Sequence, residues 1–275
     1  MKLPKLFELF EQTEDIDLWS IKPDIYIDLR PFPYGMTEQA YAYSFGEEVL
    51  VSSREELASK IEDRTKLGLV LANNMISSKF FLVSDQDIHE IARSSFGADA
   101  AVDVFYAGDI GLERAYVVNA VDSASRRIIE SQLPLTEPTV VRVLPASFAV
   151  SCFIRSLKET EGTYLIAECR PYEIYLYSCA IVEGTVVTLS SDVVKSGASD
   201  VLQEKIVFMN HKAVRFYRTD SILQVFVIAD DNSVMPADDV SKAVSSALKG
   251  KVKVSVEILK EPFPSVKGAW LFEKS

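Results

Sequence analysis

The sequence predicts an α/β fold made of two related halves, each with a mixed β-sheet flanked by helices. The first sign of duplication is a repeated motif, because apolar runs end in acid-x-Arg-Pro at residues 28–31 and again at residues 168–171. The two acids, at positions 28 and 168, lie 140 positions apart in a chain of 275. The second sign is element order, because each half reads as three meandering strands followed by alternating helices and strands. Self-similarity at half the chain length is typical of a fold built from two related domains.

The first half opens with a short helix and continues into strands. Leucine and phenylalanine at helical spacing predict a helix over residues 5–12, and the acidic residues 11–17 read as a solvated loop. Ser53 and Glu56 form a capping box, which predicts a helix start. Apolar runs bounded by turn residues predict strands. The strands are expected at 25–29, 40–45, 49–51 and 67–71.

A second segment of the first half alternates strands and helices. A strand at 79–83 leads into a helix at 85–95 that is capped by Ser84 and carries His89 on its polar side. The runs AVDVFYA and RAYVVNAV are predicted strands, and a helix at 123–133 and a strand at 139–144 follow. We therefore expect a first domain over residues 1–145, with an inserted strand and helix segment at about 77–120.

One motif in this segment has two interpretations. Asp109-Ile110-Gly111 follows a strand, as the first phosphate loop of a nucleotide-binding protein would. In that case only 165 of the 275 residues would remain for two domains, which is too few. The turn of a β-hairpin is the favoured interpretation.

The second domain is expected over residues 146–275. A helix at 145–157 has proline in its first turn and is apolar almost all round, so it is predicted to be the buried crossover, with Phe148 and Phe153 in the core. A hairpin at 163–177 follows, and a turn at Glu183-Gly184 leads to a further strand. The long helix at 199–217 carries apolar residues at spacings of three and four, which are predicted to be its buried positions: Leu202, Ile206, Met209, Ala213 and Phe216. The remaining elements are expected as strands at 185–189, 223–228 and 252–258, a helix at 236–248 and a last apolar segment at 266–272.

Composition narrows the class of function. A net charge of −11 and a pI near 4.8 disfavour nucleic acid and anionic lipid as main ligands, because both require a cationic surface. The three cysteines are odd in number and lack metal spacing, so buried thiols are expected. The chain shows no apolar run of membrane-spanning length and no signal-peptide pattern at its start, which predicts a soluble, intracellular protein.

Catalytic motifs are missing from the sequence. It contains no GxxxxGK[ST], GxGxxG or GxSxG pattern and no metal-ligand spacing. Its two histidines, His89 and His211, both fall on predicted helix surfaces, where a solvated or locally bonded side chain is the simpler interpretation.

The order of elements resembles the actin-like (ribonuclease H-like) fold, and within it the cytoplasmic assembly-platform proteins of type IV pilus and type II secretion systems, the PilM and GspL family. Several stretches carry the resemblance. They are LFELF followed by IYIDL, KFFLVSDQDIHEIARSSF, VDVFY followed by AYVVNAVDSASRRIIESQL, LPASFAVSCFIRSL, and the helix at 199–217 followed by LQVFVIADD.

The resemblance implies a nucleotide site that this sequence fills with unsuitable residues. Actin-like phosphate loops have the form Asp-x-Gly, because glycine lets backbone N–H groups approach phosphate oxygens. Asp28 and Glu168 keep the acids, whereas Arg30 and Arg170 replace the glycines, and each is followed by proline. The Gly-Gly of the adenosine loop is replaced by three residues, Ala229-Asp230-Asp231.

These departures predict a degenerate site without cofactor or metal, and a protein that is not an enzyme. The alternative is that Arg30 and Arg170 bind phosphate directly, although they can equally pair with Asp28, Glu168 or neighbouring acids. The resemblance implies a non-catalytic cytoplasmic scaffold, peripheral to the inner membrane. Its implied partners are the N-terminal domain of the secretion or pilus ATPase and the cytoplasmic tail of an inner-membrane platform protein, and a homodimer is compatible with it. The rival functions are a nucleotide-binding actin-like ATPase and a cell-division or regulatory adaptor of the same fold.

Overall fold

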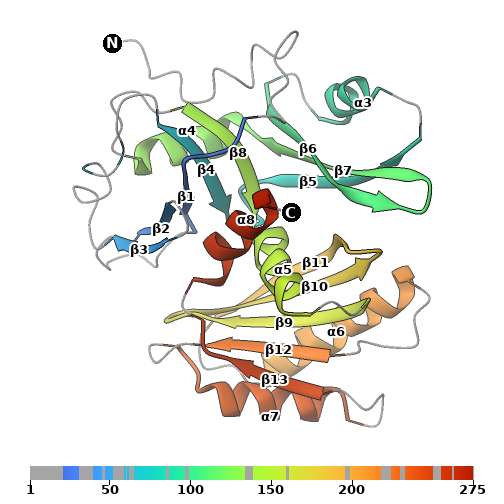
Figure 1. Cartoon of the computed structure of the whole chain (residues 1–275). Coiled ribbons are helices and arrows are strands. Elements are labelled where there is room, and N and C mark those ends of the chain that lie inside the picture. The colour runs from blue at the N-terminus through green and yellow to red at the C-terminus, as the bar shows by residue number, and fades with distance from the viewer. Residues whose placement is uncertain are drawn as a thin grey trace. The chain divides into compact units, whose positions relative to one another are not determined.

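The computed structural model of the chain places its elements as Figure 1 shows. It describes residues 21–30, 40–44, 47–51, 59, 61, 65–84, 87–96, 99–133, 139–158, 161–195, 199–217, 224–229, 233–249, 255–261 and 263–274. The helix predicted at 5–12, the acidic run at 11–17 and most of the helix predicted from residue 53 lie outside the described residues.

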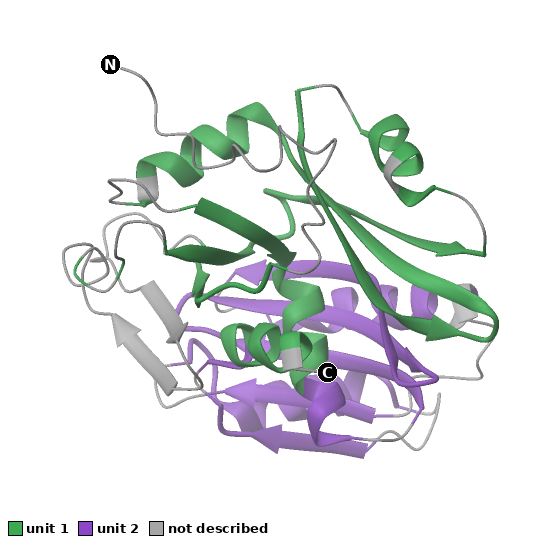
Figure 2. Cartoon of the chain, turned by 45° about the horizontal axis from the view of Figure 1, so that its top comes forward, with its two compact units in different colours: residues 1–153, 265–275 green, residues 154–264 purple. Residues whose placement is uncertain are grey.

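The chain divides into two compact units (Figure 2). Unit 1 comprises Met1–Phe153 and Ser265–Ser275, and unit 2 comprises Ile154–Pro264. The division differs from the expected boundary at 145/146 in two ways, since the start of the crossover helix and the last residues of the chain both belong to unit 1. Phe148 explains the difference, because its ring lies 5.2 Å from both Phe105 and Phe272 of the same unit.

Unit 1 contains a five-stranded mixed sheet in the order β3-β2-β1-β4-β8. β1 pairs antiparallel with β2 and parallel with β4, and β4 pairs parallel with β8. The strands are β1 (Ile25–Asp28), β2 (Ala40–Ser44), β3 (Glu47–Val51), β4 (Lys66–Leu71) and β8 (Thr139–Pro145). All were expected from the sequence, with ends that shift by one or two residues.

Alternation along β1 sorts its side chains onto two faces. Ile25, Ile27 and Leu29 enter a core cluster with Ile129 and Leu133 from the end of α4 (Ser123–Gln132), so α4 covers that face. Tyr26 and Asp28 therefore project from the opposite face, because successive residues of a strand point to opposite sides. Asp122 caps α4, accepting a hydrogen bond of 2.7 Å from the backbone N–H of Ser125.

A second, antiparallel sheet of unit 1 has the order β5-β7-β6. It occupies the range in which the inserted segment was expected, and Val83, Val104 and Val118 pack against Ile88 and Ala92 of its helix. The predicted hairpin turn is confirmed, since the chain reverses between β6 and β7 with Gly111 at a φ of 63°. The elements are β5 (Ser77–Val83), α3 (Ile88–Ser95), β6 (Ala101–Ile110) and β7 (Glu113–Val121).

Unit 2 repeats the five-stranded pattern in the order β11-β10-β9-β12-β13. The central strand β9 pairs antiparallel with β10 and parallel with β12, as β1 does with β2 and β4. The Glu183-Gly184 turn joins β10 to β11, with φ of 49° and 75°. The strands are β9 (Gly162–Cys169), β10 (Glu173–Val182), β11 (Thr185–Lys195), β12 (Gln224–Ala229) and β13 (Ser255–Leu259).

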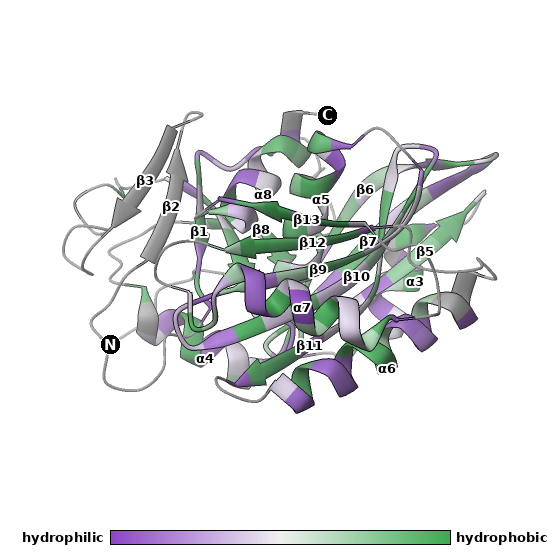
Figure 3. Ribbon diagram, turned by 90° about the horizontal axis from the view of Figure 1, so that it is seen from below, coloured by the Kyte–Doolittle hydropathy of each residue, from purple (hydrophilic) through white to green (hydrophobic). Residues whose placement is uncertain are grey.

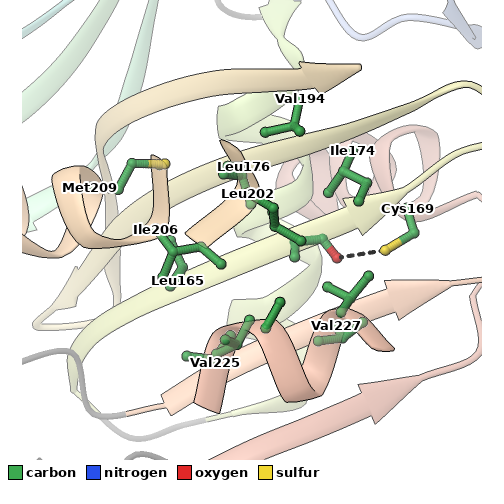
Figure 4. Close-up of a cluster of buried hydrophobic side chains, with 14 of the residues drawn as sticks. Leu165, Cys169, Ile174, Leu176, Val194, Leu202, Ile206, Met209, Val225 and Val227 are labelled. Carbon is green, nitrogen blue, oxygen red and sulfur yellow. Dashed lines mark hydrogen bonds between the residues drawn. The ribbon is translucent and has the colours of Figure 1, made fainter. Parts of the chain in front are cut away.

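Two helices, α6 (Ser199–Tyr217) and α7 (Ala237–Ala247), cover one face of this sheet (Figure 3). The buried positions predicted for α6 are confirmed as Leu202, Ile206, Met209 and Ala213, whereas the side chain of Phe216 lies outside the described part. Figure 4 shows α6 residues meeting Leu165 and Leu176 of the sheet. The three cysteines are buried and form no disulfide, as expected.

Two helices flank the points where the chain passes between the units. α5 (Ala146–Leu157) carries it from unit 1 into unit 2, and the last apolar segment is a helix, α8 (Pro264–Lys274), assigned from Ser265 to unit 1. Gly268 of α8 lies against α5 so closely that a Cβ there would stand 1.9 Å from the backbone oxygen of Ala149. Only glycine fits this crossing without displacing one helix.

We expect Gly268→Ala to lower the free energy of unfolding by about 1–3 kcal/mol, because the added methyl group meets backbone rather than a movable side chain. Urea titration checks this, with Ser245→Ala on the exposed surface of α7 as the control. Equal stability of the two variants would show that α8 can shift away from α5 without loss.

Candidate functional site

The two acid-x-Arg motifs occupy equivalent positions in the two sheets. Asp28 is the last residue of β1, and Glu168 is the penultimate residue of β9. Asp28 lies in register with Tyr41 and Val70, and Glu168 lies in register with Tyr175 and Ile228. Both acids therefore stand where a central strand ends between an antiparallel and a parallel neighbour. Each unit is described separately below.

In unit 1, the carboxylate of Asp28 is saturated by groups of the same unit. Arg30 donates from Nε to Oδ1 at 3.0 Å and from Nη2 to Oδ2 at 2.6 Å, and neither side chain is exposed. The hydroxyl of Ser265, at the start of α8, also donates to Oδ2 at 2.5 Å. Asp28 is thus buried and ion-paired, and both of its carboxylate oxygens accept hydrogen bonds.

The backbone N–H of Arg30 is engaged in the same motif. It donates to Oδ1 of Asp28 at 3.0 Å and so closes a local turn. The resemblance to actin-like proteins would give this N–H the task of donating to phosphate. Here it is directed at the protein's own carboxylate instead.

In unit 2, Glu168 has the same kind of partner. Arg170 donates from Nε to Oε1 at 3.1 Å, and the hydroxyl of Tyr177 donates to Oε2 at 3.0 Å. Glu168 and Tyr177 are buried, and the side chain of Arg170 retains 14% exposure. An arginine and a second donor from elsewhere in the unit thus hold each strand-end acid.

The loop after Glu168 is bonded on both sides. The backbone N–H of Arg170 donates to the carbonyl of Glu173 at 2.9 Å, and its carbonyl accepts from the N–H of Val234 at 2.8 Å. Ala229 is buried at the end of β12, in register with Cys169, so it lies at the same edge of the sheet as Glu168. Asp230 and Asp231 lie outside the described residues.

A second cluster of buried charges in unit 1 was not expected from the sequence. Glu273 of α8 accepts a hydrogen bond of 2.7 Å from the hydroxyl of Tyr26 and lies 3.3 Å from Nε of Arg142. Arg142 also faces Asp103 at 4.0 Å, and the two side chains are 3% and 2% exposed. Asp103 further accepts from the backbone N–H of Val143 at 2.8 Å. Two carboxylates thus share one guanidinium.

Burial and the neighbouring charges shift the pKa values of the groups in this cluster. Burial raises the pKa of Asp103 to about 6, although Arg142 and the Val143 amide act against the rise. Burial alone would lower the pKa of Arg142, but the Asp103 and Glu273 carboxylates more than offset that effect and raise it. Burial and the Glu273 carboxylate together hold the pKa of Tyr26 well above its usual value. The carboxyl group of Asp103 therefore takes up its proton at a higher pH than an ordinary aspartate does.

Most of these partners give no signal in the sequence. Ser265 meets Asp28 across 237 positions, and Glu273 meets Tyr26 across 247. Arg142 is the exception, because the sequence places its charge inside an apolar strand. A charged residue that is buried in this way needs a buried partner, although the pattern does not say which residue that is.

The catalytic alternatives gain no support from the described residues. His211 is exposed on α6, whereas the side chain of His89 lies outside the part that is described. Within the described ranges, His, Cys, Asp and Glu nowhere gather in a group that could hold a metal ion. Among the helices described, none is long and apolar enough to cross a membrane.

Comparisons with known proteins find their matches among solved structures. No protein-family model and no curated protein matches the chain. The PilM–PilN type IV pilus biogenesis complex matches with a TM-score of 0.52 at 10% identity, over 92% of this chain and 98% of the other. The cytoplasmic domain of EpsL, an inner-membrane component of the Vibrio cholerae type II secretion system, gives 0.45 at 12% identity, over 91% and 94%.

A Bacteroides thetaiotaomicron protein of unknown function with an actin-like ATPase fold gives a TM-score of 0.48 at 9% identity, over 95% of this chain and 99% of the other. At such identities a likeness bears on fold alone. The match to the PilM–PilN complex agrees with the repeated order of strands in the two sheets. The chain has the duplicated actin-like α/β fold that its sequence predicted.

Proposed function

We propose that this protein is a non-catalytic scaffold of a bacterial type II secretion or type IV pilus assembly platform. The observation that carries the non-catalytic part is the self-saturation of both strand-end acids. Asp28 and Glu168 are each bonded to the arginine two residues later, and the backbone N–H of each arginine is bonded within its own unit.

The chemistry of ATP binding supports the same view. A triphosphate is held by backbone N–H groups without a Cβ in the way, and its metal ion by free carboxylate or hydroxyl oxygens. Here Arg30 and Arg170 occupy the glycine positions, and their guanidinium groups are bonded to the acids that a metal would use. Releasing either acid would leave a buried charge without its partner, which costs several kcal/mol, of the order of 3–5.

We expect no useful binding of Mg-ATP. Calorimetry with ATP, ADP and a non-hydrolysable analogue measures this, with an ATP-binding protein in the same buffer as the positive control. A dissociation constant below about 10 μM, roughly −7 kcal/mol, would contradict the proposal and favour an actin-like ATPase.

The proposed partners are the N-terminal domain of a secretion or pilus ATPase and the cytoplasmic tail of an inner-membrane platform protein. The fold shared with the PilM–PilN complex motivates this choice, and recruitment by such partners would place the protein in the cytoplasm at the inner membrane. Charge adds a second motive. Unit 1 carries 25 acidic and 16 basic side chains, whereas unit 2 carries 15 and 13, so most of the net charge of −11 belongs to unit 1.

If acidic groups of unit 1 attract the ATPase domain, we expect its association rate to fall as salt rises past about 0.15 M, where the Debye length is about 8 Å. The dissociation rate should change less. Surface binding of the recombinant pair at several salt concentrations checks this, together with a pull-down from the native cells. Recovery of a cell-division protein without any platform component would favour the adaptor function instead.

A further inference from the structure

The inference concerns the outward side of α6, which the core of unit 2 does not use. Leu202, Ile206, Met209 and Ala213 form the buried side of this helix. Outward positions follow at helical spacing, and two of them are large apolar side chains, Val201 with 42% exposure and Phe208 with 49%. They are seven residues apart and so share one side of the helix. These two residues fill no core of the described part of unit 2.

Charge is distributed unevenly along the same side of α6. Asp200 and Glu204 lie at its amino-terminal end and are exposed. From Lys205 to the end of α6 at Tyr217 the sequence has three Lys or Arg residues and no Asp or Glu. Lys205 is paired with Asp192 of β11 at 2.7 Å, so its charge is offset. The carboxyl-terminal half of the helix is therefore a basic surface on an otherwise acidic chain.

The exposed aromatic ring lies within the basic half. Nζ of Lys212 stands 4.5 Å from the centroid of Phe208, and the exposed Arg215 follows one turn later. Basic residues near a helix carboxyl end interact favourably with its dipole, which accounts for Arg215. The dipole does not account for an exposed phenylalanine next to an exposed valine. Aromatic residues and arginine are enriched at protein-binding surfaces, and Phe208 and Arg215 provide both here.

We propose that the outward side of α6, formed by Val201, Phe208, Lys212 and Arg215, binds an acidic segment of a partner protein that carries an apolar anchor residue. The anchor covers Phe208 and Val201, and the acids of the segment face Lys212 and Arg215. This surface belongs to unit 2 and is basic, so it is distinct from the acidic attraction proposed for the ATPase domain. It does not depend on that proposal.

A protein segment fits this surface better than a membrane does. A helix that lies in a lipid interface needs a continuous apolar side, and the continuous apolar side of α6 is buried in the core. An anionic bilayer is also uniform, and it would approach Asp200 and Glu204 as closely as Lys212. A short segment can instead align its acids with one end of the helix only.

The test uses a labelled peptide of about 16 residues, long enough to form a helix, with leucines in its middle and glutamates toward one end. Fluorescence anisotropy with the whole protein measures its affinity. Phe208→Ala and the double variant Lys212→Glu/Arg215→Glu are each expected to weaken binding about tenfold or more. Lys249→Glu, an exposed lysine outside α6, is the matched control and is expected to leave the affinity unchanged.

Two further measurements make the outcome decisive. A peptide with lysine in place of every glutamate should not bind, and melting temperatures should show that the exposed substitutions leave the fold intact. Absence of peptide binding, or equal losses in the Lys249→Glu control, would overturn the proposal. Binding to phosphatidylglycerol-containing vesicles that depends on Phe208, without peptide binding, would overturn it in favour of a membrane surface.

Discussion

Truncating Phe148 to alanine is expected to lower the free energy of unfolding by about 3–5 kcal/mol, the usual cost of deleting a fully buried aromatic ring. Phe148 is 1% exposed, and its ring contacts Phe105 and Phe272 at centroid distances of 5.2 Å. It thereby joins α5 to β6 and α8 within unit 1. The loss removes packing for all three elements at once, and the backbone of α5 cannot collapse into the gap because Gly268 already lies against it.

Phe208→Ala supplies the matched control, since it removes the same ring from an exposed helix position. Its expected cost is within about 0.5 kcal/mol. Urea titration of both variants, read by circular dichroism, gives the comparison, and Phe153→Ala should resemble Phe148→Ala. Unchanged stability of Phe148→Ala together with lost partner binding would show that α5 is an exposed interface.

The fold was largely predictable because its signals are local. The alternation in β1 and β9, the spacing of apolar residues in α6 and the glycine turns each act within a few residues, and the described elements follow them. The unit boundary was harder, because it depends on contacts of Phe148 and Gly268 with residues far away in sequence. The helical nature of the last segment was likewise left open, because seven residues are too few for an apolar pattern to distinguish a helix from a strand.

The candidate site was predictable only in part, for the same physical reason. The sequence left open whether Arg30 and Arg170 pair with the acids of their own motifs. In the structure each arginine folds back onto the acid two positions before it. Ser265 and Tyr177 complete the two carboxylates, yet neither has a sequence pattern that distinguishes it from other hydroxyl residues. A contact made by a single residue far away in the sequence produces no periodic pattern, so it cannot be predicted from the sequence.

The second large effect is expected from Arg142→Met, which should lower the free energy of unfolding by about 3–5 kcal/mol, because it leaves two buried carboxylates without their cation. Arg142 lies 3.3 Å from Glu273 and 4.0 Å from Asp103, with a nearly unexposed side chain. Methionine keeps much of the volume, so the loss reports charge rather than a cavity. A cost below about 1 kcal/mol would show that the two carboxyl groups do not depend on this cation.

Asp103→Asn is the matched variant, and it should cost little or stabilise the protein at pH 7. The asparagine side chain would keep an acceptor for the Val143 amide and leave Arg142 paired one to one with Glu273.

The raised pKa of Asp103 also makes the free energy of unfolding depend on pH. The folded pKa of about 6 lies above the ordinary 3.8, so the folded protein takes up this proton first as pH falls. The contribution of Asp103 to stability therefore rises by about 2 kcal/mol between pH 7 and pH 4, and is lost as pH rises through 6. Urea titrations of both proteins over this range give the difference in unfolding free energy, in which other titrating groups cancel. A difference that does not change with pH would show that Asp103 titrates normally in the folded state.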